Sequence, residues 1–114
     1  MHLEPAHLEA AYELIKTTPP FKGWKLPPAD EVEFAISRNG NHAADAQWMG
    51  THWRIRVNGK WTGNLSTLLR YMMHEMVHVA HGIQCPSDSA HHGQEFKRLG
   101  RLVCRFHYID PKTF

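Results

Sequence analysis

The chain has 114 residues, of which 42% are hydrophobic and 21% charged, and its mean hydropathy is -0.48. These values are typical of one soluble globular domain and exclude a disordered chain. The first ten residues lack the apolar run of a signal peptide, and no stretch approaches the roughly 18 apolar residues of a spanning helix, so we expect a cytoplasmic protein with no membrane partner. A net charge of +2 is too mild to indicate a nucleic-acid partner by itself.

The first half of the chain predicts one helix, one loop and two strands. Residues 4–17 place apolar side chains at helical spacing, and Pro19-Pro20 should end that helix. Residues 18–30 are rich in proline and predict a loop. Residues 32–36 and 53–57 alternate apolar and polar side chains, which is typical of strands. We expect residues 53–57 to form an edge strand, to which an extended peptide can pair.

The second half predicts two helices. Residues 64–81 should form the first, with Asn64 or Ser66 as its cap and Gly82 just past its end. After a polar loop, residues 92–106 should form the second, with an apolar face that includes Phe96 and Phe106. The order helix, strands, helix, helix predicts an α+β fold with a small antiparallel or mixed sheet packed on helices.

Cysteine and histidine usage narrows the chemistry. Cys85 and Cys104 are too few for a disulfide framework or a four-cysteine zinc site, so we expect free thiols, with Cys104 in the core and Cys85 in a loop. The chain also has ten histidines, far above average usage. That number directs attention to metal-ligand spacing.

Residues 74–78 read His-Glu-Met-Val-His within the predicted helix 64–81. Side chains four residues apart lie one turn apart on the same face, so both imidazoles can reach one metal ion. Zinc binds neutral imidazole and keeps an open position for water in catalytic sites, and a neighbouring carboxylate can take a proton from that water. The motif predicts His74 and His78 as zinc ligands and Glu75 as the general base.

The position of this motif on the helix favours a functional role. The apolar residues from Leu65 to Ala80 form one stripe, and His74, His78 and His81 lie nearly opposite. We therefore expect these three histidines to face a cleft or the solvent. The alternative is a solvated histidine face without a metal.

A zinc site needs a third protein ligand. The candidates are His81, His91, His92 and Glu95. His81 lies two turns from His74, about 10 Å along the axis, so one metal cannot take both unless the helix breaks early. His91 and His92 lie where the polar loop meets the last helix, and Glu95 lies in that helix. The spacing does not decide which of these three residues is the third ligand.

The stretch Leu68–Leu99, LLRYMMHEMVHVAHGIQCPSDSAHHGQEFKRL, resembles the SprT-like metallopeptidases. Their signature is an HExxH helix, a polar loop and a second helix that opens with a His-Gly-x-x-Phe-type motif, which residues 92–96 match. The segments 11–14, 26–28 and 57–58 also have counterparts in that family. The resemblance implies a zincin-like fold, peptide-bond hydrolysis and one zinc ion per chain on His74, His78 and His92.

The resemblance also bears on domains and partners. Bacterial SprT proteins carry a C-terminal zinc ribbon, and Spartan-type proteases add DNA-binding segments. This chain has neither, so we expect one SprT-like metallopeptidase domain over residues 1–114. The implied partner is a protein or peptide substrate, and DNA-associated proteins are a candidate class.

Basic and aromatic residues give weaker signals. Lys97, Arg98, Arg101 and Arg105 lie on one side of the last predicted helix, and Arg54, Arg56 and Lys60 form a second cluster. Each of the two clusters is either a solvated surface or a site that contacts phosphate groups. We expect the four tryptophans, at positions 24, 48, 53 and 61, to be core or cleft-wall residues. Donors for an oxyanion are His81, His91, Tyr71 and Tyr108, without a ranking among them.

Two other functional classes compete with the peptidase hypothesis. One is a zinc-stabilised module that binds DNA or protein without turnover. A carboxylate at Glu75 argues against it, because a structural zinc site usually closes with four protein ligands and has no use for that carboxylate. The other is a nucleic-acid-binding domain in which the histidines are incidental, and salt-dependent binding without metal would favour it.

Overall fold

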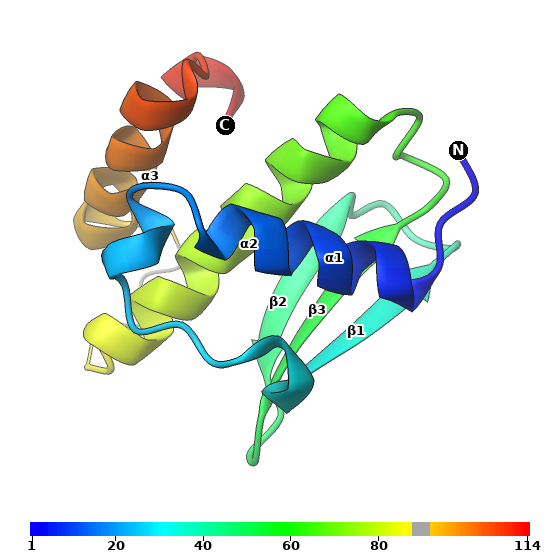
Figure 1. The fold of residues 1–114 in the computed structure, drawn as a ribbon, viewed down its shortest axis with the longest axis horizontal. Helices are drawn as coiled ribbons and strands as arrows, with labels where there is room; N and C mark the ends of the chain where they lie inside the picture. The colour runs from blue at the N-terminus through cyan, green and yellow to red at the C-terminus, as the bar shows by residue number, and fades with distance from the viewer. Residues whose placement is uncertain (88–91) are drawn as a thin grey trace.

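The computed structural model describes residues 1–87 and 92–114. Its helices are α1 (Pro5–Lys16), α2 (Leu65–Gln84) and α3 (Gln94–His107), and its strands are β1 (Val32–Ser37), β2 (Ala44–Trp48) and β3 (Trp53–Asn58) (Figure 1). Short 3₁₀ turns lie at Phe21–Gly23, Ala29–Glu31 and Pro111–Thr113. This arrangement confirms the α+β class with a small mixed sheet of three strands.

The central strand of the sheet is β3. The strand order is β1-β3-β2, with β1 parallel and β2 antiparallel to β3. The expectation that residues 53–57 form an edge strand is therefore wrong, because β2 occupies the far side of β3. The sequence did not predict β2, since Ala44, Asp45 and Gln47 are residues with weak strand preference. Its pairing with β3 compensates for that preference.

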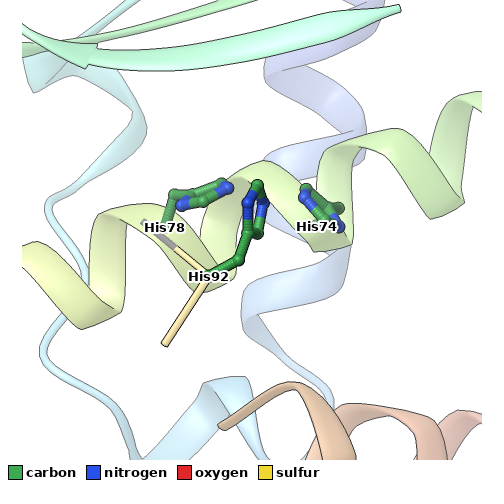
Figure 2. Close-up of side chains that lie close together, drawn as sticks. All are labelled: His74, His78 and His92. Atoms are coloured by element: carbon green, nitrogen blue, oxygen red, sulfur yellow. The ribbon is translucent and has the colours of Figure 1, made fainter. Parts of the chain in front are cut away.

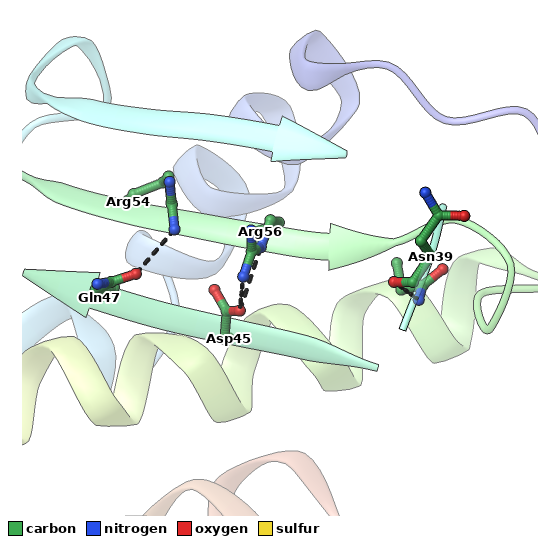
Figure 3. Close-up of polar contacts among 6 residues, drawn as sticks. Asn39, Asp45, Gln47, Arg54 and Arg56 are labelled. Carbon is green, nitrogen blue, oxygen red and sulfur yellow. Dashed lines mark hydrogen bonds and ion pairs between the residues drawn. The ribbon is translucent and has the colours of Figure 1, made fainter. Parts of the chain in front are cut away.

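The two faces of the sheet differ in character. Ile55 and Val57 of β3 are fully buried on the inner face. On the opposite face Arg54 donates to Gln47 at 2.8 Å, and Arg56 forms an ion pair with Asp45 at 2.6 Å (Figure 3). The charge of Arg56 is thus compensated within the sheet.

Helix α1 buries Leu8, Tyr12 and Ile15, and ends at Lys16 as the proline pair predicted. The Tyr12 hydroxyl donates to the carbonyl oxygen of Pro27 at 2.6 Å, and the Lys16 ammonium donates to the same oxygen at 3.2 Å. These bonds fasten the loop that leads into β1.

Helix α2 is the element that positions the site. Asn64 caps its N-terminus, because its side chain accepts a hydrogen bond from the Thr67 amide at 2.9 Å. The helix continues to Gln84, so the prediction that Gly82 lies past its end is wrong. A Cβ atom at Gly82 would lie 2.7 Å from two ring atoms of Trp53. The glycine therefore admits the tryptophan ring rather than ending the helix.

The core lies between α2, the inner face of the sheet, α1 and α3. Met72, Met76 and Val77 of α2 are fully buried, whereas Leu65 is 59% exposed and lies outside the core. On α3, Phe96, Leu99 and Val103 are buried, but Phe106 is 49% exposed, which corrects its predicted place on the apolar face.

The two cysteines occupy the expected environments. Cys104 is buried, Cys85 is half-buried just after α2, and both are free thiols.

Among the residues described, no helix combines the length and apolar character needed to cross a bilayer.

Candidate metal centre

Three histidine side chains converge beside α2. His74 and His78 come from α2, and His92 comes from the segment just before α3 (Figure 2). One ring nitrogen from each lies within 4.8 Å of the others. The structure therefore brings together the three residues that the resemblance implied as ligands, and the ligand role itself stays a prediction.

Phe96 explains how α3 places His92. This ring lies one turn along the chain from His92 and stacks on His78, with centroids 4.3 Å apart and planes inclined by 28°. It also lies 4.8 Å from the ring of His92 and 5.3 Å from that of His74. A buried aromatic ring four residues after His92 thus forms one side of the histidine cluster.

His74 has a partner for its second ring nitrogen. Its Nδ1 lies 3.1 Å from the main-chain oxygen of Phe114, and because that oxygen can only accept, Nδ1 must donate. That hydrogen bond leaves Nε2 deprotonated and available to a metal. Burial lowers the pKa of His74, neighbouring His92 lowers it further, and the bond to Phe114 opposes both. The net shift favours the neutral imidazole that zinc binds.

Phe114 is a site residue that the sequence did not reveal. Arg70 donates to the carbonyl oxygen of Thr113 at 3.0 Å, which holds the last turn against α2. The Phe114 ring lies 5.3 Å from the ring of His74. No periodicity or motif connects residues 40 positions apart, so no sequence signal could have found this contact.

Glu75 lies next to the cluster without belonging to it. Its side chain is buried, with 5% exposure for the residue. Burial raises the pKa of Glu75 to about 8, and the nearby charge of Asp45 adds to the rise. Glu75, His74 and Tyr71 line a cavity of about 490 Å³ that Ala43 and Ala44 close from the side of β2.

Two of the other candidate ligands, Glu95 and His81, do not join the cluster. Glu95 accepts hydrogen bonds from Arg98 at 3.0 and 3.2 Å. His81 is buried, with 5% exposure, which contradicts its expected place facing a cleft or solvent. Phe96 of α3 covers it, with ring centroids 6.3 Å apart. His91 lies outside the described residues.

Three of the four candidate oxyanion donors, Tyr71, His81 and Tyr108, lie in the part of the chain that the structure describes, and their positions differ. Tyr71 lines the same cavity as Glu75, and His81 is buried against α3. Tyr108 is 96% exposed and lines neither cavity beside the cluster. Tyr71 is therefore the candidate whose position suits contact with a bound substrate.

The donor set fits zinc. Three imidazoles with an open side match the three protein ligands of a catalytic zinc site. Zinc binds imidazole nitrogen at about 2.0–2.1 Å, so small side-chain rotations would bring all three nitrogens to one ion. The tautomer of His74 that its hydrogen bond requires is also the one with a free Nε2.

Comparison with models of protein families identifies a match over most of the chain. The family model described as the SprT-like family matches residues 11–113. No curated protein and no solved structure matches the chain.

Proposed function

Because the chain belongs to the SprT-like family, we propose that it is a zinc-dependent metallopeptidase with a zincin-like fold that cleaves protein or peptide substrates. One observation carries the proposal: one nitrogen from each of three histidines lies within 4.8 Å of the others, and the buried carboxyl group of Glu75 follows His74 directly on α2. A purely structural metal site has no need of that carboxylate.

The proposed ligands are His74, His78 and His92, for one zinc ion per chain. When bound, zinc would polarise the scissile carbonyl and lower the pKa of water at the site. His74 is held in the required tautomer by Phe114, and Phe96 packs against the rings of all three histidines. These contacts limit the motion of the ligands before metal arrives.

Glu75 is the proposed general base. Its carboxylate takes a proton from the attacking water and returns it to the leaving amine. A pKa near 8 in the metal-free protein lies close to working pH, and a cation held by the adjacent histidines would favour the ionised form that accepts the proton.

The proposed substrate cleft lies along β2. This strand is at one edge of the sheet, and Ala43 and Ala44 line the same cavity as Glu75. An extended peptide pairing with β2 would pass the carboxylate, so the β-augmentation expected for residues 53–57 moves to β2. Proline substitution at Ala46 tests this pairing, with loss of cleavage in a folded, zinc-loaded protein as the expected result.

Zinc content is the first test of the metal site. We expect one zinc ion per chain in the wild type and in Glu95→Ala, and loss of tight binding in His92→Ala, since Glu95 pairs with Arg98 instead of joining the cluster. Inductively coupled plasma mass spectrometry of the purified proteins measures the ratio. If His92→Ala retained bound zinc and Glu95→Ala lost it, the third ligand would be Glu95 and not His92.

Turnover tests the role of Glu75. We expect Glu75→Gln to keep the fold and one zinc ion, and to lower kcat at least about a thousandfold, because glutamine cannot accept the proton. Cleavage of a denatured protein substrate, followed by mass spectrometry, provides the measurement. Zinc-loaded wild type that cleaves nothing would favour a binding module without turnover.

A further inference from the structure

A second cavity opens on the α3 side of the histidine cluster. It has a volume of about 380 Å³, and His74 and His92 form its boundary with the metal site. Phe114 and His74 line both this cavity and the one that Glu75 lines, so the cleft has two parts that meet at these residues. A side chain next to a bond held at the histidines would enter one of these parts.

The second cavity combines an apolar floor with a cationic rim. Phe96 and Phe114 supply apolar surface, and Lys97 and Arg101, one turn apart on α3, line the same space. Both cations are exposed, and within residues 1–87 and 92–114 neither has an ion-pair partner. No aspartate or glutamate side chain lines the cavity among those residues. A ligand that suits this cavity therefore carries a small anionic group at the end of an apolar stem.

We propose that Lys97 and Arg101 form a subsite that selects substrates with an aspartate or glutamate side chain beside the scissile bond. The inference rests on the proposed peptidase function and adds a substrate class to it. A glutamate places two methylenes against Phe96 and Phe114 and its carboxylate between the two cations, as the pairing of apolar floor and charged rim requires.

The geometry favours a peptide side chain over a DNA backbone. Phosphates along DNA are best met by a row of unpaired cations on an open surface. Here Arg98 is already paired with Glu95, and Lys97 and Arg101 line a recess next to the histidines. Arg105 continues the same helical face and is exposed, but it does not line the cavity. That residue provides a matched control.

Peptide binding tests the subsite without requiring turnover. The protein is zinc-loaded Glu75→Gln, and the probes are two fluorescein-labelled alanine–glycine octapeptides, one with a central glutamate and one with a central lysine. We expect the glutamate peptide to bind about tenfold more tightly by fluorescence anisotropy. Adding Lys97→Glu and Arg101→Glu should abolish or reverse the preference, whereas adding Arg105→Glu should retain it.

Each other outcome has a defined meaning. Equal affinity for the two peptides in all variants would overturn the subsite. The subsite would also be overturned if Arg105→Glu reduced the preference as strongly as the double substitution of Lys97 and Arg101. If both variants then bound single-stranded DNA more weakly than the parent protein, this face of α3 would be a nucleic-acid-binding surface. In parallel, wild type is incubated with a degenerate peptide library. Failure to cleave it with zinc bound would overturn the peptidase proposal, while a charge-dependent peptide preference would still support the subsite formed by Lys97 and Arg101.

Discussion

At the scale of single residues, Glu75 is a carboxyl group whose burial has a cost. Its pKa is about 8 in the folded, metal-free protein against an ordinary value of 4.5. Between these values the folded state binds more protons than the unfolded state, so the free energy of unfolding falls as pH rises. The charge that suits Glu75 for catalysis thus destabilises the metal-free fold.

Substitution of Glu75 should therefore stabilise the metal-free protein. Glutamine cannot ionise. The free energy of unfolding of Glu75→Gln should therefore exceed that of the wild type by an amount that grows from pH 5 upward and reaches on the order of 3 kcal/mol at pH 7. Urea unfolding of protein treated with a chelator, at pH 5 and at pH 7, measures the difference. Glu13→Gln, at an exposed carboxylate of α1, should change stability little at either pH. A pH-independent effect of Glu75→Gln would contradict the assigned burial cost.

The sequence was most informative about the site residues that lie close together along the chain. His74, Glu75 and His78 follow from helical spacing alone, because their arrangement is local. The position of His92 depends on the chain reversal between α2 and α3, which spacing left open and only the resemblance indicated. Phe114 and Asp45 act through space on His74 and Glu75, from distant segments, and no local pattern contains that contact.

At the scale of elements, the two helical glycines should respond oppositely to alanine. A Cβ at Gly82 would meet Trp53 at 2.7 Å, whereas at Gly100 it would meet Phe114 at an ordinary 3.4 Å. We expect Gly82→Ala to destabilise the fold by about 1–3 kcal/mol, since a clash outweighs a gain in helix propensity of about 1 kcal/mol. Gly100→Ala should be neutral or stabilising by up to about 1 kcal/mol.

Denaturant unfolding of both alanine variants measures these changes. A stabilised Gly82→Ala protein would mean that Trp53 moves away at little cost, and that Gly82 is not required for close packing. Near-ultraviolet circular dichroism provides an independent reading of the tryptophan environment.

The errors in predicting elements have the same physical origin. Gly82 resembles a C-cap in sequence, but its role is set by Trp53 on another element. Ala44, Asp45 and Ala46 carry no strand signal, and tertiary pairing with β3 overrides their preference. Where alternation was strong, as in residues 32–36 and 53–57, strands were predicted and found. Their order in the sheet was not predictable, because it depends on β2.

At the scale of the whole molecule, zinc should couple to stability. A ligand that binds only the folded state stabilises it by about 2.7 kcal/mol at a free concentration one hundred times its Kd. We therefore expect removal of zinc to lower Tm by on the order of 10 °C in the wild type. Differential scanning calorimetry with and without chelator measures the shift.

Two histidine variants make that measurement specific. His92→Ala should lose most of the zinc-dependent shift, whereas His42→Ala, at an exposed histidine outside the cluster, should keep it. An equal shift in both variants would place the metal elsewhere on the protein.

The central position of β3 has a consequence for exchange with solvent. β3 hydrogen-bonds to β1 on one side and to β2 on the other, so both rows of its backbone groups are paired. Fraying of either outer strand uncovers only half of them, and full exposure requires both outer strands to separate. Neighbouring amides of β3 point to opposite sides, so β1 protects the amide of Ile55 and β2 protects that of Arg56. In deuterated water, equally slow exchange at both amides should therefore report global unfolding.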